Sequence, residues 1–285
     1  FDSGLSLDWN KDRKWSMGKR IIVSASSDIG FELGASWVRA GHEVLGTFRD
    51  ESASLKIFSA GMTAVQLNLS NRESISLAKD ELFKWLKGQR WEVVVLAAGS
   101  MMPISKFRNA NFDVWSEAFE VNFLAQAGIL QSLLAQAGKN SQVIHFAGAG
   151  TNSASENFSS YSVSKIAGIK LFEVLAAEEP GIKFTSLGPG WVKSKIHQET
   201  LLAGGNAGNA LHATEQRFRD EDFFPMEKVI EAIDWIVRAD SRLVSGRNFS
   251  AVNDPLQSDK LASLLLEFPD MFKLRRSGNY KLSAE

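Results

Sequence analysis

Residues 19–30 of this chain have the sequence K-R-I-I-V-S-A-S-S-D-I-G, in which an apolar run leads into a turn of small residues. The run predicts a buried strand over 19–24, and the residues after it predict a helix over 29–40. In a parallel α/β sheet, the backbone amides of such a turn and the N-terminus of the helix can lie against a phosphate group. The stretch therefore indicates the first β-α unit of a nucleotide-binding sheet.

The same alternation of short apolar runs and longer periodic segments continues along the chain. It predicts an α/β fold with a single Rossmann-type doubly wound parallel sheet of about seven strands and helices on both faces. The expected strands cover 19–24, 43–48, 63–67, 92–97, 141–147, 182–188 and 246–251. The expected helices cover 29–40, 52–59, 72–87, 112–137, 157–179 and 226–239.

Residues 192–224 break this alternation with the run A-G-G-N-A-G-N-A and scattered charges. A loop of this length is unusual in a compact α/β domain, and its place after an expected strand predicts a lid-like insertion. The insertion belongs to a dinucleotide-binding domain over 17–253, followed by a tail, 254–285, that is expected to pack on the same domain. We interpret residues 1–16, which precede Met17, as an extension or a tag remnant.

The composition narrows the range of functions. Of 285 residues, 44% are apolar, and 32 basic and 33 acidic residues leave a net charge of −1, which favours neither nucleic acid nor an anionic membrane. The chain has no cysteine, and its four histidines lack metal-ligand spacing. No apolar run has the length of a membrane span. We expect a soluble, cytoplasmic protein without a metal, whose partners are small molecules and copies of itself.

Tyr161 and Lys165 are the main candidates for chemistry. They lie four residues apart in F-S-S-Y-S-V-S-K, a spacing that places both side chains on one face of a helix. An ammonium group beside a phenol stabilises the phenolate and lowers the tyrosine pKa, which would suit general acid–base catalysis. An exposed ring beside a solvated cation gives the same spacing.

Taken in order, several segments resemble the short-chain dehydrogenase/reductase family over about residues 18–253. The glycine motif of that family falls on residues 23–30, its N-N-A-G on L-A-A-G at 96–99, and its Y-x-x-x-K on Tyr161 and Lys165. Its catalytic asparagine matches Asn122, and its P-G-x-V-x-T matches Pro189, Gly190, Val192 and Ser194.

The resemblance implies transfer of a hydride between a nicotinamide and a carbonyl carbon. Tyr161 would exchange the proton, Lys165 would tune Tyr161 and bind the nicotinamide ribose, and Asn122 would hold a relay water. An asparagine bonded to backbone is the alternative for Asn122. The cofactor-binding residues that the resemblance implies are Ser24, Ser26, Ser27, Ile29, Gly30, Arg49, Asn68, Ala98, Gly99, Tyr161, Lys165, Pro189, Gly190, Val192 and Ser194.

Arg49, at the end of the second expected strand, bears on the choice of cofactor. NAD-specific members of the family carry an acid there, whereas an arginine suits a 2′-phosphate, so NADP is favoured over NAD. Pairing of Arg49 with Asp50 or Glu51 is the competing interpretation. Asn68 would lie near the adenine amine.

Several positions depart from the family pattern, among them Ser24, which stands where the motif has its first glycine. Gly148 stands where the family has its catalytic serine, and Asp28, which could also cap the helix, stands where it has a glycine. Thr151 or Ser153 could replace the missing hydroxyl, or both could be ordinary loop residues. The alternative to an active enzyme is a degenerate relative that binds dinucleotide as a sensor or partner subunit.

Substrate and assembly are implied only in outline. The C-terminal part resembles a subgroup of these reductases that accompanies surface-polysaccharide genes, which implies a ketone or alcohol of a sugar or nucleotide-sugar. Lys193, Lys195, Arg217 and Arg219 could meet a phosphate on such a substrate. The family pairs the helices expected at 112–137 and 157–179 across a two-fold axis, which implies a homodimer or homotetramer.

Overall fold

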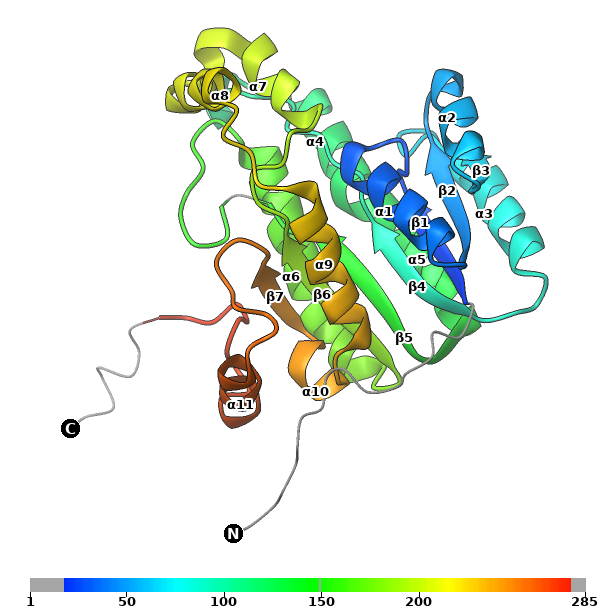
Figure 1. Cartoon of the computed structure of the whole chain (residues 1–285). Helices are drawn as coiled ribbons and strands as arrows, with labels where there is room; N and C mark the ends of the chain where they lie inside the picture. The colour runs from blue at the N-terminus through cyan, green and yellow to red at the C-terminus, as the bar shows by residue number, and fades with distance from the viewer. Residues whose placement is uncertain (1–17, 149, 278–285) are drawn as a thin grey trace.

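The computed structural model describes residues 18–148 and 150–277 as a seven-stranded sheet with helices on both faces (Figure 1). All strand pairs are parallel, in the order β3-β2-β1-β4-β5-β6-β7. The strands are β1 Lys19–Val23, β2 Glu43–Phe48, β3 Thr63–Gln66, β4 Trp91–Leu96, β5 Ala137–Phe146, β6 Ile182–Gly188 and β7 Arg247–Ser250. The predicted fold class is confirmed, and residues 1–16, interpreted above as an extension, lie outside the described residues.

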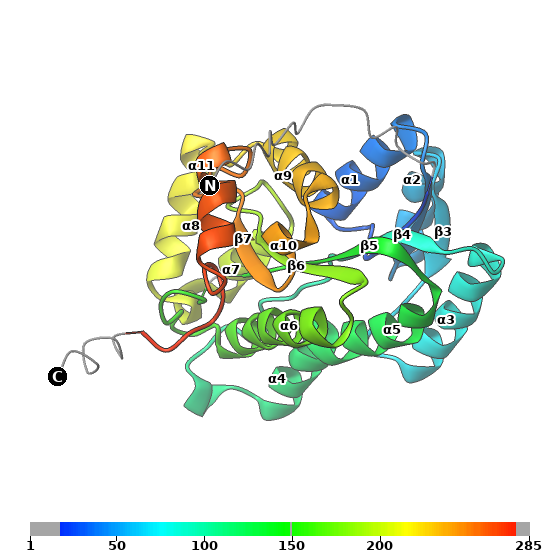
Figure 2. The same ribbon diagram turned by 90° about the horizontal axis from the view of Figure 1, so that it is seen from below.

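Two apolar layers hold the helices on the sheet, one on each face (Figure 2). One layer packs α1 Asp28–Arg39, α9 Met226–Arg238 and α10 Ser241–Val244 against the sheet. The other packs α3 Arg72–Leu86, α5 Ala125–Leu133 and α6 Ser159–Glu178. The central strands β1 and β4 end in apolar runs, residues 21–23 and 93–96, because side chains on both of their faces are buried.

The connections after β1 and β4 run in opposite directions along the sheet, since β2 and β5 lie on opposite sides of the β1–β4 pair. This is the topological switch point, where open parallel sheets bind ligands at the carboxyl ends of their strands. Ser27 caps α1 at this edge by accepting a hydrogen bond of 3.1 Å from the Gly30 amide.

The helix expected over 112–137 is interrupted. α4 Phe112–Phe119 leads into a π-helical turn, Glu120–Leu124, before α5, and β5 begins at Ala137 instead of 141. Asn122 lies in the π-helical turn and bonds to the loop after β4, which explains the bulge: the extra residue turns its side chain inward. The helix period continues across such a turn, so the sequence pattern does not reveal it.

Residues 192–224, expected to be a loop, contain two helices above the carboxyl edge of the sheet (Figure 1). We call them the α7–α8 segment: α7 is Ile196–Ala203 and α8 is Asn209–Asp220. Their apolar side chains form a small cluster with Met101, Ile104 and Phe158 instead of packing on the sheet. Because glycines separate the two helices and little of their surface is buried, the hydrophobic period is weak.

β7 is followed by α11 Asp259–Glu267, which the expected helices did not include. Arg247 of β7 donates hydrogen bonds to the carbonyls of Leu265 at 2.7 Å and Met271 at 2.5 Å, so a cation satisfies the C-terminal end of α11. α2 Ser54–Ser59 packs by Ile57, while Leu55 and Phe58 remain exposed. No helix in residues 18–148 and 150–277 is long and apolar enough to span a bilayer.

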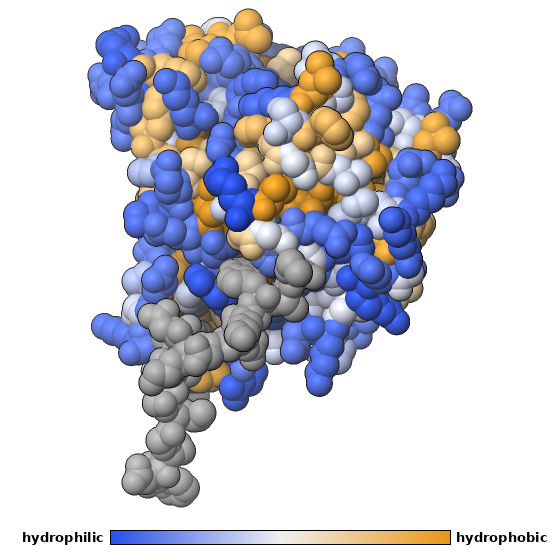
Figure 3. Space-filling view, turned by 45° about the vertical axis from the view of Figure 1, so that its right-hand side comes forward, coloured by the Kyte–Doolittle hydropathy of each residue, from blue (hydrophilic) through white to orange (hydrophobic). Residues whose placement is uncertain are grey.

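Hydrophilic side chains cover most of the face seen in Figure 3, with apolar side chains between them in its upper half.

The contrast between a buried and an exposed phenylalanine gives a stability test with a matched control. Phe184 of β6 is fully buried against Phe172, whereas Phe58 is 72% exposed. We expect Phe184→Ala to lower the free energy of unfolding by about 3–5 kcal/mol, because it leaves a cavity. Phe58→Ala should change it by less than about 0.5 kcal/mol in the same urea titration. Equal losses would contradict this core.

Candidate active site

A cavity of about 1480 Å³ lies at the carboxyl edge of the sheet, below the α7–α8 segment. It is lined by the first β-α turn, by the residues after β4 and by α6. Fourteen of the sixteen predicted site residues line it: Ser24, Ser26, Ser27, Ile29, Arg49, Asn68, Ala98, Gly99, Tyr161, Lys165, Pro189, Gly190, Val192 and Ser194. Gly30 and Asn122 lie behind the lining.

The first β-α turn is a close-packed cradle. Ser24 takes the left-handed conformation, φ +70°, at the position where the family motif has glycine, and its amide donates to Thr47 Oγ1 at 2.8 Å. A Cβ on Gly30 would lie 2.6 Å from the Ser24 carbonyl and 2.7 Å from Ser27 Oγ. Gly30 is therefore required by the turn itself, whose Ser24, Ser27 and Gly30 amides already donate hydrogen bonds to Thr47 Oγ1, the Ser24 carbonyl and Ser27 Oγ.

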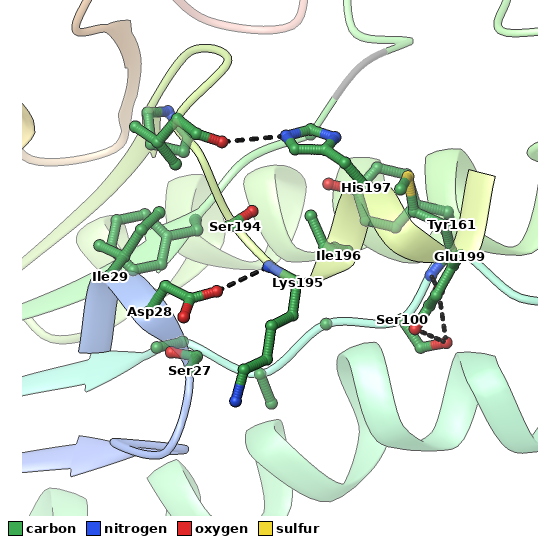
Figure 4. Close-up of a pocket in the computed structure, with 18 of the residues that line it drawn as sticks. Ser27, Asp28, Ile29, Ser100, Tyr161, Ser194, Lys195, Ile196, His197 and Glu199 are labelled. Carbon is green, nitrogen blue, oxygen red and sulfur yellow. Dashed lines mark hydrogen bonds between the residues drawn. The ribbon is translucent and has the colours of Figure 1, made fainter. Parts of the chain in front are cut away.

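Asp28 does not cap α1, because Ser27 fills that role. Its carboxylate Oδ2 instead accepts a hydrogen bond of 2.6 Å from the backbone amide of Lys195, at the start of the α7–α8 segment (Figure 4). The interpretation of Asp28 as the helix cap is wrong. The sequence offers no signal for this contact, since the two residues lie 167 positions apart.

Tyr161 and Lys165 lie together on α6, as their spacing predicts, with Lys165 Nζ 5.7 Å from the centre of the Tyr161 ring. Lys165 is 3% exposed, and its ammonium donates to the Ala98 carbonyl at 3.2 Å. Burial lowers the Lys165 pKa to about 8. The Tyr161 pKa is raised to about 12, by burial first and by the Glu199 carboxylate second. The expected lowering of the Tyr161 pKa by Lys165 is therefore absent from this structure.

Glu199 of α7 is a cavity residue that the sequence did not indicate. Its carboxylate accepts hydrogen bonds from the Met101 amide at 2.5 Å and from Ser100 Oγ at 3.2 and 3.3 Å (Figure 4). Burial raises the Glu199 pKa despite these donors. A single glutamate on a segment without a clear period carries no sequence signal, so only the fold brings it near Tyr161.

Asn122 is 1% exposed and does not reach the cavity. Its amide nitrogen donates to the Ser100 carbonyl and its amide oxygen accepts from the Ser100 amide, both at 2.8 Å. The Asn122 carbonyl accepts from Gln126 Nε2 at 3.0 Å. Asn122 thus fixes the loop after β4, and the predicted water relay stays a prediction.

Gly148 lies directly against the catalytic candidate. A Cβ at this position would come within 2.6–2.7 Å of Tyr161 Cε1, Cζ and Oη, so no side chain fits unless the ring moves. Neither Thr151 nor Ser153 lines the cavity, and Thr151 Oγ1 lies 3.4 Å from the Gly148 carbonyl. Ser155 of the same loop does line the cavity.

Arg49 and Asn68 line the far end of the cavity. Arg49 donates to Asp50 Oδ2 from Nε at 3.1 Å and from Nη2 at 3.0 Å, and its side chain is 71% exposed. The competing interpretation of this arginine is thus the contact present in the structure. The pair is solvent-exposed and weak, so Arg49 remains available to an incoming phosphate. Asn68 Oδ1 accepts from the Ser70 amide at 3.0 Å.

The charged residues suggested for substrate phosphate are placed differently from one another. Lys195 and Arg217 line the cavity, whereas Lys193 and Arg219 do not. Arg217 pairs with Asp222 at 2.9 Å and lies 5.0 Å from the centre of the Trp191 ring. His197 also contacts Trp191. Its ring stacks on the Trp191 ring with 3.9 Å between the ring centres, and its Nε2 bonds to the Val192 carbonyl.

Comparison with known proteins places these features in a family. A family model described as short chain dehydrogenase matches residues 19–203. A curated relative, 1-deoxy-11-beta-hydroxypentalenate dehydrogenase of Streptomyces arenae, is 24% identical over 211 residues, which is 68% of this chain and 74% of the relative.

Solved structures share the fold at low identity. The KRED1-Pglu enzyme superposes with a TM-score of 0.74 at 20% identity, covering 81% of this chain and 99% of that one. A short chain dehydrogenase from Shigella flexneri 2a, solved in complex with NADP, has a TM-score of 0.68 at 19% identity, covering 82% and 96%.

The buried ammonium of Lys165 predicts a specific pH dependence of stability. Between a folded pKa of about 8 and the ordinary value of 10.5, the unfolded chain binds more protons than the folded one, so stability rises with pH. Relative to Lys165→Met, the parent should gain about 1 kcal/mol per pH unit in urea unfolding between pH 8 and 9.5. Lys170→Met, at an exposed lysine of α6, should keep the dependence of the parent. A flat difference between parent and Lys165→Met would contradict the buried cation.

Proposed function

This chain belongs to the short-chain dehydrogenase family, and we propose that it is an NADP-dependent oxidoreductase that interconverts a small-molecule ketone and alcohol. The observation that carries this proposal is that Tyr161 and Lys165, the latter 3% exposed, line the same cavity as the turn between β1 and α1. Family members of known activity, such as the Streptomyces dehydrogenase, are oxidoreductases. The reaction would take place where the phenol meets the cavity.

Tyr161 would be the proton donor. When bound, the dinucleotide supplies or accepts the hydride. Because the Tyr161 pKa is about 12, its hydroxyl is protonated at neutral pH and can donate a hydrogen bond to a carbonyl oxygen. Lys165, fixed by the Ala98 carbonyl, would stabilise the phenolate left after proton transfer. The buried surroundings exclude water from this step.

The cradle suits a dinucleotide. Ser24, Ser26 and Ser27 line the cavity and would hold the diphosphate with their hydroxyls at the N-terminus of α1, and Ala98 and Gly99 would adjoin the nicotinamide ribose beside Lys165. Arg49 would meet a 2′-phosphate with its two donor edges. The NADP bound in the Shigella relative supports this preference.

We propose that the substrate carries hydroxyl groups, as a sugar ketone does. Glu199 presents a carboxylate from α7, and Met101, Phe158 and Trp191 supply apolar surface for a ring or chain. Residues 192–224 would then act as the substrate lid.

A sensor or partner subunit that binds dinucleotide without turnover is the second candidate. Two departures from the family pattern motivate it. Gly148 stands in place of the family's catalytic serine, and Asp28 stands in place of a glycine of the cofactor-binding motif. The two candidates agree on binding and differ on turnover.

Self-association is supported by an exposed aromatic row on α4. Phe112, Trp115 and Phe119 stack at 5.7 Å between successive ring centres, and Phe112 is 63% exposed. Val163 of the neighbouring α6 is 48% exposed. We propose that a second copy covers this face, as a homodimer or within a homotetramer.

Turnover can be separated from binding with one substitution. Tyr161→Phe removes the proton donor and leaves the ring, so we expect NADPH-consuming ketone reduction to fall by about 10²–10⁴-fold while NADPH affinity stays within about twofold. Tyr280→Phe makes the same change at the other tyrosine and should keep the parental rate. If the parent binds NADPH but reduces no ketone in a panel that includes sugar nucleotides, the sensor function is supported instead.

The cofactor preference rests on Arg49. We expect NADPH to bind more tightly than NADH in a fluorescence titration, and Arg49→Ala to remove most of that difference, since it deletes the fork that meets the 2′-phosphate. Lys56→Ala, on α2 over the Phe31 ring, removes a nearby cation that does not line the cavity and should preserve the preference. Equal affinities of the parent for NADPH and NADH would contradict the proposal.

A further inference from the structure

Asp28 joins the nucleotide cradle to the α7–α8 segment through a single charged contact. Its Oδ2 accepts the Lys195 amide at 2.6 Å, and Asp28 itself lines the cavity. Figure 4 shows the carboxylate turned from the first turn of α1 toward the backbone that enters α7. Since Ser27 already caps α1, the carboxylate is not needed to complete the helix.

The α7–α8 segment packs on its own small cluster of side chains and not on the sheet. Its apolar contacts form a small cluster around Met101, Ile104 and Phe158, separate from the two layers that pack the sheet. The polar contacts include a second carboxylate, Glu199, which reaches back from α7 to Ser100 and Met101. A segment that packs outside the two main layers opens more easily than the core, so the polar contacts that join it to the rest of the fold contribute to its position.

Asp28 also stands where an anionic ligand would bind. If the proposed function is right, the diphosphate lies against residues 24–30, beside this carboxylate. Like charges about 6 Å apart, at an effective dielectric constant of about 40, repel by an amount that corresponds to about a tenfold change in affinity.

We propose that Asp28 is a specificity-determining residue that lowers the affinity for the dinucleotide diphosphate and, through Lys195, fastens the α7–α8 segment over the cavity. The inference rests on the proposed function for the identity of the ligand. Charge and hydrogen bonding are separable here: a carboxylate repels the diphosphate, whereas any acceptor at this position can hold the Lys195 amide.

Two variants separate these effects. Asp28→Asn keeps an acceptor for Lys195 and loses the charge, and Asp28→Ala loses both. Asp259→Asn is the matched control, because Asp259 also follows a capping serine as the first residue of a helix, α11, but does not line the cavity. We expect both Asp28 variants to bind NADPH about tenfold more tightly than the parent and Asp259→Asn to bind as the parent does.

A smaller ligand tests where the charge acts. Adenosine 2′-monophosphate keeps the 2′-phosphate and lacks the diphosphate. In competition titrations its affinity should change by less than about twofold in Asp28→Asn, because the group that Asp28 repels is missing. An equal gain for both ligands would overturn the proposal in favour of a general charge effect.

Limited trypsin digestion reads the position of the α7–α8 segment without any ligand. The cleavage sites are Lys193 and Lys195, directly before α7, and Arg217 and Arg219 in α8. Asp28→Ala should be cut there at least several-fold faster than the parent, and Asp28→Asn at the parental rate, since cleavage follows the open population. Equal cutting of all variants would overturn the fastening role.

The binding results separate this inference from the proposed function. If the parent binds NADPH and Asp28→Asn binds it equally, the inference fails and the proposed function survives. If neither the parent nor any variant binds NADPH or NADH, the proposed function fails and the inference with it. If Asp28→Asn binds NADPH more tightly than the parent and Asp259→Asn does not, the result supports both the inference and the proposed function.

Discussion

The hydrogen bond from the buried Lys165 ammonium to the Ala98 carbonyl is the constraint on which the site depends. It joins α6 to the end of β4, across the switch point of the sheet. A cation so far from water is costly unless its neighbours accept it, and burial accordingly lowers the Lys165 pKa to about 8. Burial first and the Lys165 charge second hold the pKa of His145 well below its usual range, so its imidazole, which does not line the cavity, is neutral. Gly99, whose Cβ would lie 3.5 Å from Nζ, leaves room for this arrangement.

The other constraint is steric, and it explains a departure that the sequence made look like a loss. With Tyr161 seated against Gly148, a serine could not be restored there without displacing the ring. The Tyr161 ring therefore packs against the backbone of Gly148, at the position where the family pattern has a serine hydroxyl. In the proposed reaction, hydrogen bonding to a carbonyl oxygen would then depend on Tyr161 and on Ser155, which lines the cavity from the same loop as Gly148. Removing one donor weakens such a site without abolishing it, since the proton donor remains.

Much of the fold could be predicted because buried parallel strands leave a strong apolar signal, as at Val93–Leu96, and because the family motifs fall at the ends of those strands. Three features could not be predicted. The π-helical turn at Asn122 keeps the helical period and is fixed by contacts with Ser100. The helices α7 and α8 bury too little surface to show a period. The Asp28–Lys195 and Glu199–Met101 contacts join residues far apart in sequence, so no spacing rule finds them. The predicted lowering of the Tyr161 pKa was wrong for a related reason. Helical spacing brings Lys165 near, but burial and the Glu199 carboxylate raise the pKa, and the sequence shows neither.

The departures from the family pattern are physically connected, and this bears on whether the site has decayed. Asp28 replaces a glycine and holds the backbone that enters α7, while Glu199 of that same helix holds the loop that Asn122 fixes from behind. Gly148 replaces a serine and receives the ring whose pKa Glu199 raises. Loss without selection leaves unsatisfied groups and voids, since nothing repairs them. Here each replacement has gained a specific partner, at 2.6 Å for Asp28 and in direct ring contact for Gly148. That pattern favours a site adjusted around its α7–α8 segment over one that has lost its chemistry.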